Sequence, residues 1–414
     1  MAPQINRFAS MSKTVEIRIH GFAFGGRAVG RDSHGKVCFV RGAVPGETVQ
    51  VCLTSDKKNF SEGILSGVTA ASPLRLIPEC PNSCPGCSYA HVPYEMELEW
   101  KQRQFRSFAE KARLNSDPAD FLRDPIGSPV RSGWRSKIRL SLDRAPDGGI
   151  AAGYRGEDNR TLIPVSDCLL AVPSIRAALR DGQWRGRLTG DEKTVTFRWT
   201  RPDGLRIYTD RGGTALIRDE LDGFGIFETG ESSFFQINPY MSGKLAGEVL
   251  ERVRSAAPAL LAELYCGCGC FSILCTEHLS GLRAWGVELD PLAVRCAAEN
   301  ARLHGVADRT AFDAGDSAKI FRAKFPHGLP PNSLLLVDPP RTGLDPAALN
   351  LIARSGAKWI LYVSCSPDTL FRDLRQLENA AYRITESRLL DLFPSTAHFE
   401  SMTLLAPAIT EGSG

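Results

Sequence analysis

Residues 359–367 read Trp-Ile-Leu-Tyr-Val-Ser-Cys-Ser-Pro, an apolar run that ends on the thiol of Cys365. Two other apolar runs end in a similar way. Residues 334–337 lead into Asp338-Pro-Pro-Arg341, and residues 260–265 lead into Gly267-Cys-Gly269. Short apolar runs bounded by turn residues are typical of buried strands. Parallel strands end at one edge of an open α/β sheet, where ligands bind. We therefore expect a reaction site at this edge, with Cys365 as a candidate nucleophile.

The surrounding segment, 236–410, alternates two kinds of pattern. Strand-like apolar runs occur at 260–265, 284–289, 334–337 and 360–363, and helical patterns occur at 292–304, 346–355 and 369–377. Strands that alternate with helices over such a length imply a doubly wound sheet. The predicted fold class is therefore α/β, with a Rossmann-like domain at the C-terminal end of the chain.

The N-terminal segment, 12–70, has a different pattern. Apolar and polar residues alternate at 15–19, 36–40 and 48–53, and glycine-rich turns separate these runs. Short strands of period two at this spacing suggest a small antiparallel, OB-like barrel. Basic residues are scattered over it (Arg27, Arg31, Arg41, Lys57 and Lys58). They are compatible both with RNA contact and with an ordinary solvated barrel surface.

The middle segment, 71–235, is predicted to be a mixed α/β domain. Residues 95–114 have helical periodicity. Residues 133–142 alternate as a strand with Arg135, Lys137 and Arg139 on one face. That basic face is either the solvated side of a half-buried strand or, because cations alternate with Trp134, a surface for phosphates and bases.

The composition restricts the class of protein. The chain has 414 residues, a net charge of +3 and 43% hydrophobic residues, which is enough for several globular cores. It has no apolar stretch long enough for a transmembrane helix and no secretion-signal pattern, so we expect a protein without membrane contact. Its 12 cysteines then indicate the reducing cytoplasm, with thiols used for metal binding or catalysis.

A cofactor site is indicated by the turn Gly267-Cys-Gly269 and by Glu288, which lies 21 residues after Gly267 at the end of the next strand. Glycine lets the backbone approach a ligand closely, and a carboxylate at this offset accepts hydrogen bonds from ribose hydroxyls. The third glycine of a pyrophosphate loop is missing, which disfavours a nicotinamide dinucleotide. A nucleoside without phosphates, such as S-adenosylmethionine, fits better.

The candidate reacting groups are Cys365, Asp338 and Glu400. Methyltransferases that act on an exocyclic amine commonly have Asn where this chain has Asp338, so the combination with Cys365 favours attack on carbon. A thiolate that adds to C6 of uracil makes C5 nucleophilic, and a base such as Glu400 then removes the C5 proton. Taken alone, Cys365 is better interpreted as a buried structural thiol. The alternative for Glu400 is a solvated surface carboxylate.

Six ordered motifs resemble those of the RNA uracil-C5 methyltransferase family. They are Ser233-Phe-Phe-Gln236-Ile-Asn238, Tyr265-Cys-Gly-Cys-Gly-Cys-Phe271, Glu288, Asp338-Pro-Pro-Arg341, Ser364-Cys365-Ser-Pro367 and His398-Phe-Glu400. The segment Gly21-Phe-Ala-Phe-Gly-Gly-Arg-Ala-Val-Gly30 resembles a TRAM domain. The resemblance implies Cys365 as nucleophile and Glu400 as base. It also implies that Gln236, Tyr265, Glu288 and Asp338 surround S-adenosylmethionine. Cys270 and Ser366 depart from the family, which often has Asn at these positions.

Four further cysteines form a candidate metal site: Cys80, Cys84, Cys87 and Cys168. Four thiolates can bind zinc or an iron–sulfur cluster, and their spacing leaves both alternatives open. The resemblance to family members with a [4Fe–4S] cluster favours iron–sulfur. In contrast, Cys266, Cys268 and Cys270 alternate along the chain, and we interpret them as packing residues whose side chains do not converge.

The resulting hypothesis is S-adenosylmethionine-dependent methylation of uridine C5 in RNA, through a covalent bond between Cys365 and C6. A TRAM-like barrel together with the cysteine cluster resembles the branch that acts on 23S rRNA, so we predict that substrate and a monomeric enzyme. The alternatives are the same reaction on the T-loop of tRNA, and an RNA-binding assembly factor that has lost catalysis.

Overall fold

The computed structural model describes residues 13–80, 84–145 and 149–408. The chain forms two compact units. The first contains the described residues up to Gln104 together with Pro394–Ala397, and the second contains the described residues of Phe105–Phe393 and those from His398 onward. Among the described helices, none has the length and apolarity needed to cross a bilayer.

The first unit begins with a closed five-stranded barrel, which confirms the predicted barrel fold. Its strands are β1 (Thr14–Phe22), β2 (Ala28–Arg31), β3 (Val37–Arg41), β4 (Thr48–Asp56) and β5 (Phe60–Ala70), in the order β1-β2-β3-β5-β4. The alternating apolar residues fill the interior, where Ile17, Val40 and Val49 are fully buried. The prediction of a purely antiparallel barrel was wrong, because β3 and β5 pair in parallel.

Helix α1 (Tyr94–Lys111) confirms the predicted helix and ends three residues earlier than expected. Within the first unit, Lys101 Nζ donates to Glu97 Oε1 over 2.7 Å, and both side chains are fully buried. Glu97 Oε1 also accepts a hydrogen bond of 2.6 Å from the backbone N–H of Ser395. This carboxylate, together with the N–H of Tyr89, which donates to the Ser395 carbonyl over 3.1 Å, ties the short segment 394–397 to the first unit although it lies near the end of the chain.

The second unit contains a small antiparallel sheet in the order β10-β9-β6-β7-β8. Its strands are β6 (Lys137–Arg144), β7 (Ile150–Arg155), β8 (Leu162–Pro164), β9 (Thr194–Thr200) and β10 (Gly204–Thr209). Strand β6 begins four residues later than predicted, and Trp134 is buried before it. The other elements of this region are α2 (Pro118–Phe121), α3 (Pro173–Asp181), the 3-10 helix η1 (Gln183–Arg187), and the hairpin of β11 (Leu216–Leu221) and β12 (Gly225–Gly230).

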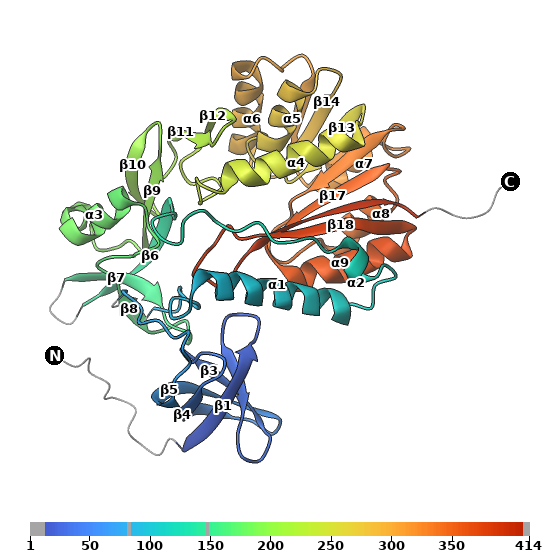
Figure 1. The fold of residues 1–414 in the computed structure, drawn as a ribbon. Coiled ribbons are helices and arrows are strands. Elements are labelled where there is room, and N and C mark those ends of the chain that lie inside the picture. Colours follow the sequence, from blue (N-terminus) through green and yellow to red (C-terminus); the bar gives the residue numbers. More distant parts are fainter. Residues whose placement is uncertain (1–12, 81–83, 146–148, 409–414) are drawn as a thin grey trace. The chain divides into compact units, whose positions relative to one another are not determined.

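A seven-stranded sheet forms the core of the second unit (Figure 1), in the order β15-β14-β13-β16-β17-β19-β18. The first five strands pair in parallel, and β18 and β19 are antiparallel additions. The strands are β13 (Leu260–Leu264), β14 (Arg283–Glu288), β15 (Thr310–Ala314), β16 (Ser333–Val337), β17 (Trp359–Ser364), β18 (Tyr382–Leu390) and β19 (Glu400–Pro407). This arrangement confirms the predicted Rossmann-like domain.

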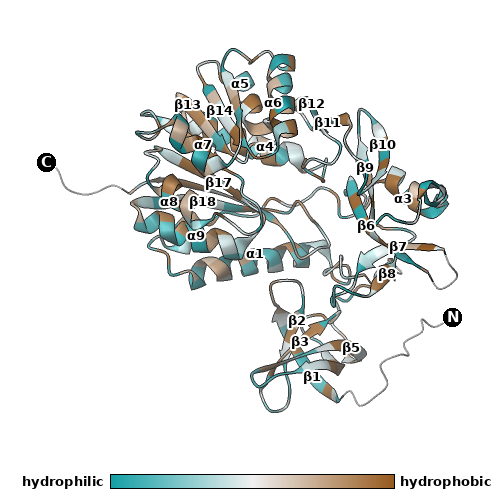
Figure 2. Ribbon diagram, turned by 180° about the vertical axis from the view of Figure 1, so that it is seen from behind, coloured by the Kyte–Doolittle hydropathy of each residue, from teal (hydrophilic) through white to brown (hydrophobic). Residues whose placement is uncertain are grey.

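Helices flank this sheet, which is why its central strands are almost entirely apolar. They are α4 (Ser242–Ala256), α5 (Cys270–His278), α6 (Pro291–Leu303), α7 (Ser317–Lys324), α8 (Pro346–Ala353) and α9 (Pro367–Asn379). All five residues of β16 are buried, and Figure 2 shows hydrophobic strands between helices of mixed polarity. Helix α6 starts one residue before the predicted helix, at Pro291, because the Asp290 carboxylate caps it by accepting from Leu292 N.

Candidate active site

The parallel register brings the predicted strand ends to one edge of the sheet. Leu264 of β13 pairs with Val287 of β14 on one side and with Val337 of β16 on the other. Tyr265, Glu288 and Asp338 therefore lie side by side where these strands end. The next strand, β17, ends at Ser364, immediately before Cys365. Four of the residues predicted from sequence thus come from four neighbouring strands.

The antiparallel strand β19 brings Glu400 to the same place. Ser364 pairs with Ser401, so the next position along each strand sets Cys365 opposite Glu400. Glu400 is 6% exposed, which rules out the alternative of a solvated surface carboxylate. Cys365 is half-buried, so its thiol is accessible at the strand end.

Burial and neighbouring negative charge raise the pKa of both Cys365 and Glu400. Burial raises the pKa of the Cys365 thiol to about 11, and the carboxylates of Glu400 and Asp338 add to this effect. Burial also raises the pKa of Glu400 well above its ordinary value, with a further contribution from Asp338. The resting site at neutral pH therefore holds the Cys365 thiol in its neutral form, and the surroundings of Glu400 also favour the protonated carboxyl group.

Arg341 is the cation that opposes these shifts, and sequence reasoning assigned it no role. Its positive charge lowers the pKa of both Cys365 and Glu400. The signal for it was present in the sequence, because Arg341 closes the Asp-Pro-Pro-Arg turn after a buried strand.

The glycine turn after β13 is built around Glu288. Its Oε2 accepts from the N–H of Gly267 over 3.1 Å, and its Oε1 accepts from the N–H of Leu289 and of Asp290. Gly267 has a φ of +55° and would meet nothing within 4 Å if it carried a Cβ. Gly269, with a φ of +82°, would bring a Cβ within 3.0 Å of Phe312. Gly267 therefore faces open space, while Gly269 serves helix packing.

Asp338 and Gln236 have polar groups available to a ligand. Both are half-buried, and neither side chain has a hydrogen-bond partner in the part of the chain that the structure describes. Burial raises the pKa of Asp338 to about 7. Together with Glu288 and the open backbone at Gly267, they form a set of oxygen acceptors and amide groups. Such a set suits the ribose hydroxyls and the ammonium group of S-adenosylmethionine.

The three cysteines of the glycine turn differ in part from the expectation. Cys266 and Cys268 are buried, as expected for packing residues. The prediction that the side chains do not converge was wrong for one pair, because the Cys268 and Cys270 sulfur atoms are 3.6 Å apart. The left-handed conformation of Gly269 between them turns the chain and brings the two side chains together.

The four candidate metal ligands are distributed over both units. Cys80, Cys84 and Cys87 belong to the first unit and are half-buried, whereas Cys168 belongs to the second unit and is buried. Within residues 13–80, 84–145 and 149–408, no three His, Cys, Asp or Glu side chains form a metal-binding group. The cysteine cluster therefore stays a prediction.

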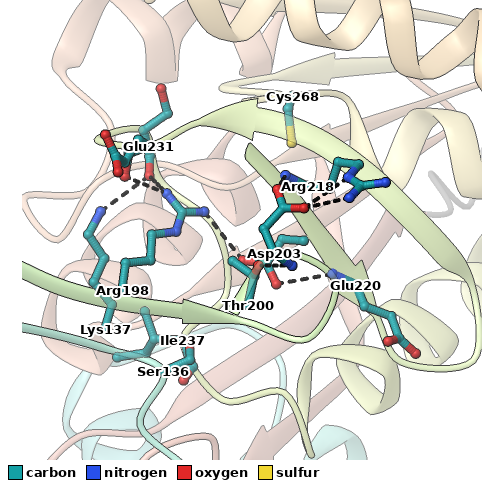
Figure 3. Close-up of polar contacts among 12 residues, drawn as sticks. Ser136, Lys137, Arg198, Thr200, Asp203, Arg218, Glu220, Glu231, Ile237 and Cys268 are labelled. Carbon is teal, nitrogen blue, oxygen red and sulfur yellow. Dashed lines mark hydrogen bonds and ion pairs between the residues drawn. The ribbon is translucent and has the colours of Figure 1, made fainter. Parts of the chain in front are cut away.

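The basic face of β6 is partly used inside the protein (Figure 3). Lys137 Nζ donates to the carbonyls of Ser232 and Ser233 over 3.2 and 3.3 Å, and Arg139 Nε donates to Thr194 Oγ1. Burial and the neighbouring Arg198 lower the pKa of Lys137 to about 8. Lys137 thus supports the interpretation of a half-buried strand.

Two family models match parts of the chain. Residues 331–408 match the tRNA (Uracil-5-)-methyltransferase model, and residues 12–65 match the TRAM domain. These ranges contain the strand ends at Asp338, Cys365 and Glu400, and most of the barrel.

Similar proteins cover nearly the whole chain. The 23S rRNA (uracil(1939)-C(5))-methyltransferase RlmD of Marinomonas sp. is 29% identical over 90% of both chains. The protein of the same name from Edwardsiella ictaluri is 26% identical over 92% of this chain and 93% of its own. Among solved structures, the Pyrococcus abyssi tRNA (uracil-54, C5)-methyltransferase, in complex with S-adenosyl-L-homocysteine, matches 94% of this chain and 99% of its own. Its TM-score is 0.69 and its identity 22%, so this likeness concerns the fold.

Proposed function

The chain is a member of the RNA uracil-C5 methyltransferase family, and on that premise we propose that it methylates C5 of a uridine in 23S rRNA. One observation carries the proposed chemistry: β17 and β19 set Cys365 opposite Glu400, with Arg341 beside both. A nucleophile, a base and a cation at the edge of the sheet meet the needs of methyl transfer to carbon.

In the proposed reaction, the Cys365 thiol and the Glu400 carboxyl group first give their protons to solvent water, and the Cys365 sulfur then bonds to C6 of the uracil. The electron pair of the C5–C6 double bond moves into the ring and makes C5 nucleophilic. Bound S-adenosylmethionine supplies the methyl group that C5 takes up. Glu400, deprotonated at this stage, removes the proton from C5, and the C6–S bond breaks to restore the double bond and release Cys365. Arg341 stabilises the thiolate before addition and after release. A uridine within folded RNA must leave its stack for its ring to reach Cys365.

The test is an RNA with 5-fluorouridine at the target position. Fluorine replaces the C5 proton that the base would remove, so the last step cannot occur. The covalent complex should therefore accumulate and survive denaturing electrophoresis. Cys365→Ala should form no adduct, while Glu400→Gln should form an adduct even with ordinary uridine, because only the last step is blocked. Product formation without any adduct, or full methyl transfer by Cys365→Ala, would refute the mechanism.

For the substrate, the supporting observation is the full-length similarity to two enzymes that are named for 23S rRNA. The solved structure with a tRNA substrate in its name supports the fold but does not favour tRNA, because it is only 22% identical. Mapping 5-methyluridine in ribosomal and transfer RNA, with and without this protein, distinguishes these substrates. No change in either RNA would favour the inactive assembly factor.

We also propose that Cys80, Cys84, Cys87 and Cys168 hold a [4Fe–4S] cluster with a structural role, with zinc as the alternative. The support is the family resemblance and the presence of four cysteines of suitable chemistry. Protein purified without oxygen should contain iron and acid-labile sulfide, and Cys84→Ser should lose both. Stoichiometric zinc without sulfide would support the alternative.

The division of labour along the chain is likewise a proposal. We assign RNA binding to 12–70, cluster binding to 71–235 and methyl transfer to 236–410, although residues 12 and 409–410 lie outside the described residues. We propose a cytoplasmic monomer. Light scattering coupled to size exclusion, with and without RNA, tests the oligomeric state.

A further inference from the structure

A buried arginine lies behind the segment that carries Gln236. Arg198, on β9, is 2% exposed, and its guanidinium points at the backbone that follows β12 (Figure 3). We infer that Arg198 is a positioning residue for methyl transfer, which fixes the backbone of 230–233 and thereby places Gln236 for the methyl donor. The inference rests on the proposed function, in which Gln236 contacts S-adenosylmethionine.

The contacts of Arg198 converge on one short stretch of backbone. Nη1 donates to the carbonyl oxygens of Gly230, Glu231 and Ser233 over 2.9, 2.8 and 3.1 Å. Nη2 lies 3.4 Å from Asp219 Oδ2 on β11. A buried guanidinium carries a large desolvation cost unless all its donors are paired, so this arrangement requires a defined backbone conformation at 230–233.

Other side chains of the small sheet bind the same stretch. Tyr208, on β10, donates its hydroxyl to the Glu231 carbonyl over 2.8 Å. Lys137, on β6, donates to the carbonyls of Ser232 and Ser233. Four consecutive carbonyls, from 230 to 233, are thus held by side chains from three strands.

The far side of Gln236 is anchored as well. The carbonyl of Ile237 accepts from the backbone N–H and the hydroxyl of Ser136, over 2.9 and 3.0 Å. Asn238 is fully buried and donates from Nδ2 to the Leu392 carbonyl over 2.8 Å. Gln236 therefore lies between two fixed points, while its own side chain has no partner among the described residues. Its position is set by its neighbours, which leaves its amide available to a ligand.

Loss of Arg198 should be tolerated by the fold. Its charged partner, Asp219, has a pKa raised by burial to about 6, and Arg198 opposes that shift. Without Arg198 the Asp219 carboxyl group can take up a proton, which avoids an unpaired buried charge. Arg198→Met fills a similar volume and removes both the charge and the donors. Arg198→Lys keeps the charge without the planar fork and serves as a second, milder variant.

The experiment is a double-mutant cycle on binding of S-adenosylhomocysteine, measured by calorimetry on the full chain. Arg198→Met and Gln236→Ala should each weaken binding about tenfold, the usual effect of one lost hydrogen bond. The double variant should bind no more weakly than Gln236→Ala alone, because Arg198 acts through Gln236. Arg198→Lys should bind with intermediate affinity. Arg201→Met is the matched control: Arg201 follows β9 and forms only exposed ion pairs with Glu220 and Asp222, so its loss should leave binding unchanged.

Additive effects in the double variant would overturn the inference, because Arg198 would then act independently of Gln236. Unchanged binding by Arg198→Met or by Gln236→Ala would overturn it too. Should Arg198→Met fail to fold, the same cycle with Arg198→Lys decides the question. These outcomes differ from failure of the proposed function, which the wild-type protein alone would show by forming no adduct with 5-fluorouridine RNA.

Discussion

Cys365 lies in surroundings that favour its neutral form. Three acidic groups and one cation share this edge of the sheet. Burial raises the pKa of Cys365, Glu400 and Asp338; Asp338 raises the pKa of the other two further, Glu400 adds to the shift of Cys365, and Arg341 lowers the pKa of Cys365 and Glu400. A thiol with a raised pKa is a weak nucleophile until it is deprotonated. In the proposed mechanism, the Cys365 thiol must therefore lose its proton before it reacts, and Arg341 is the neighbouring cation that favours this loss.

The first prediction concerns pH and Arg341. Because the Cys365 pKa is about 11, the thiolate fraction grows about tenfold per pH unit below that value. Single-turnover methyl transfer should therefore accelerate from pH 7 to pH 9. Arg341→Met should be slower and should shift the profile to higher pH, while Arg341→Lys should shift it less. A rate that is flat from pH 7 to 9 and unaffected by Arg341→Met would contradict this account.

The second prediction concerns Asp338 and stability. An acid with a folded pKa of about 7, against an ordinary value of 3.8, binds its proton more tightly in the folded state. It therefore costs stability progressively as pH rises from about 4 to 7, and fully above that. Asp338→Asn should raise the melting temperature at pH 8 by a few degrees, equivalent to about 1 kcal/mol, since the group is partly exposed. The gain should vanish near pH 3.5, and methyl transfer should fall. Equal melting temperatures at pH 8 would show that Asp338 is not destabilised by burial.

At the scale of elements, the two glycines after β13 have different roles, which the sequence alone does not distinguish. Both glycines of the turn have a positive φ, but only Gly269 is crowded, whereas the space beside Gly267 is open. Glycine tolerates such backbone conformations, while other residues pay about 1–2 kcal/mol. The same substitution should therefore have different consequences at the two positions.

The third prediction compares Gly267→Ala with Gly269→Ala. Gly269→Ala combines backbone strain with close contacts to Phe312 and Ile273, so it should lower the melting temperature markedly. Gly267→Ala adds only strain, but its methyl group enters the open space beside the turn. It should weaken binding of S-adenosylhomocysteine more than it lowers the melting temperature. The reverse ranking in calorimetry and thermal unfolding would argue against a cofactor at Gly267.

In the methyltransferase domain, apolar runs predicted β13, β14, β16 and β17, whose residues are mostly buried, and helical patterns predicted α6, α8 and α9. The meeting of Tyr265, Glu288 and Asp338 followed from the rule for parallel strand ends. The pairing of Cys365 with Glu400 required the register of β17 and β19, which joins residues 35 positions apart and has no local signal. The parallel β3–β5 pair, the role of Arg341 and the contact between Cys268 and Cys270 also depend on tertiary geometry.

At the scale of the whole molecule, the barrel provides fewer available cations than its sequence suggests. Arg27 forms an ion pair with Glu62 over 2.6 Å, and Arg41 donates to the Cys84 carbonyl. Lys57 and Lys58, in the turn between β4 and β5, are both exposed. Because binding to RNA phosphates releases counterions, these two lysines are the barrel residues best suited to nonspecific attraction.

The fourth prediction follows from this surface. The double variant Lys57→Ala/Lys58→Ala should bind its RNA more weakly, and the slope of log K against log salt should fall by about 1 to 2. The double variant to arginine keeps both charges and should restore the wild-type slope. Filter binding between 50 and 200 mM salt provides the measurement. If neither the affinity nor the slope changes, these lysines do not contact RNA.

The buried carboxylate of Glu97 has a consequence for the preparation of shorter fragments of this enzyme. It anchors Ser395, and the chain reaches Glu400 only five residues later. A fragment that starts at Phe105 would contain every proposed reacting group, yet the peptide leading to its base would have lost its support. The part of the chain that the proposed reaction needs is therefore discontinuous in sequence. Removal of the N-terminal part would leave the segment before Glu400 without its anchor at Glu97.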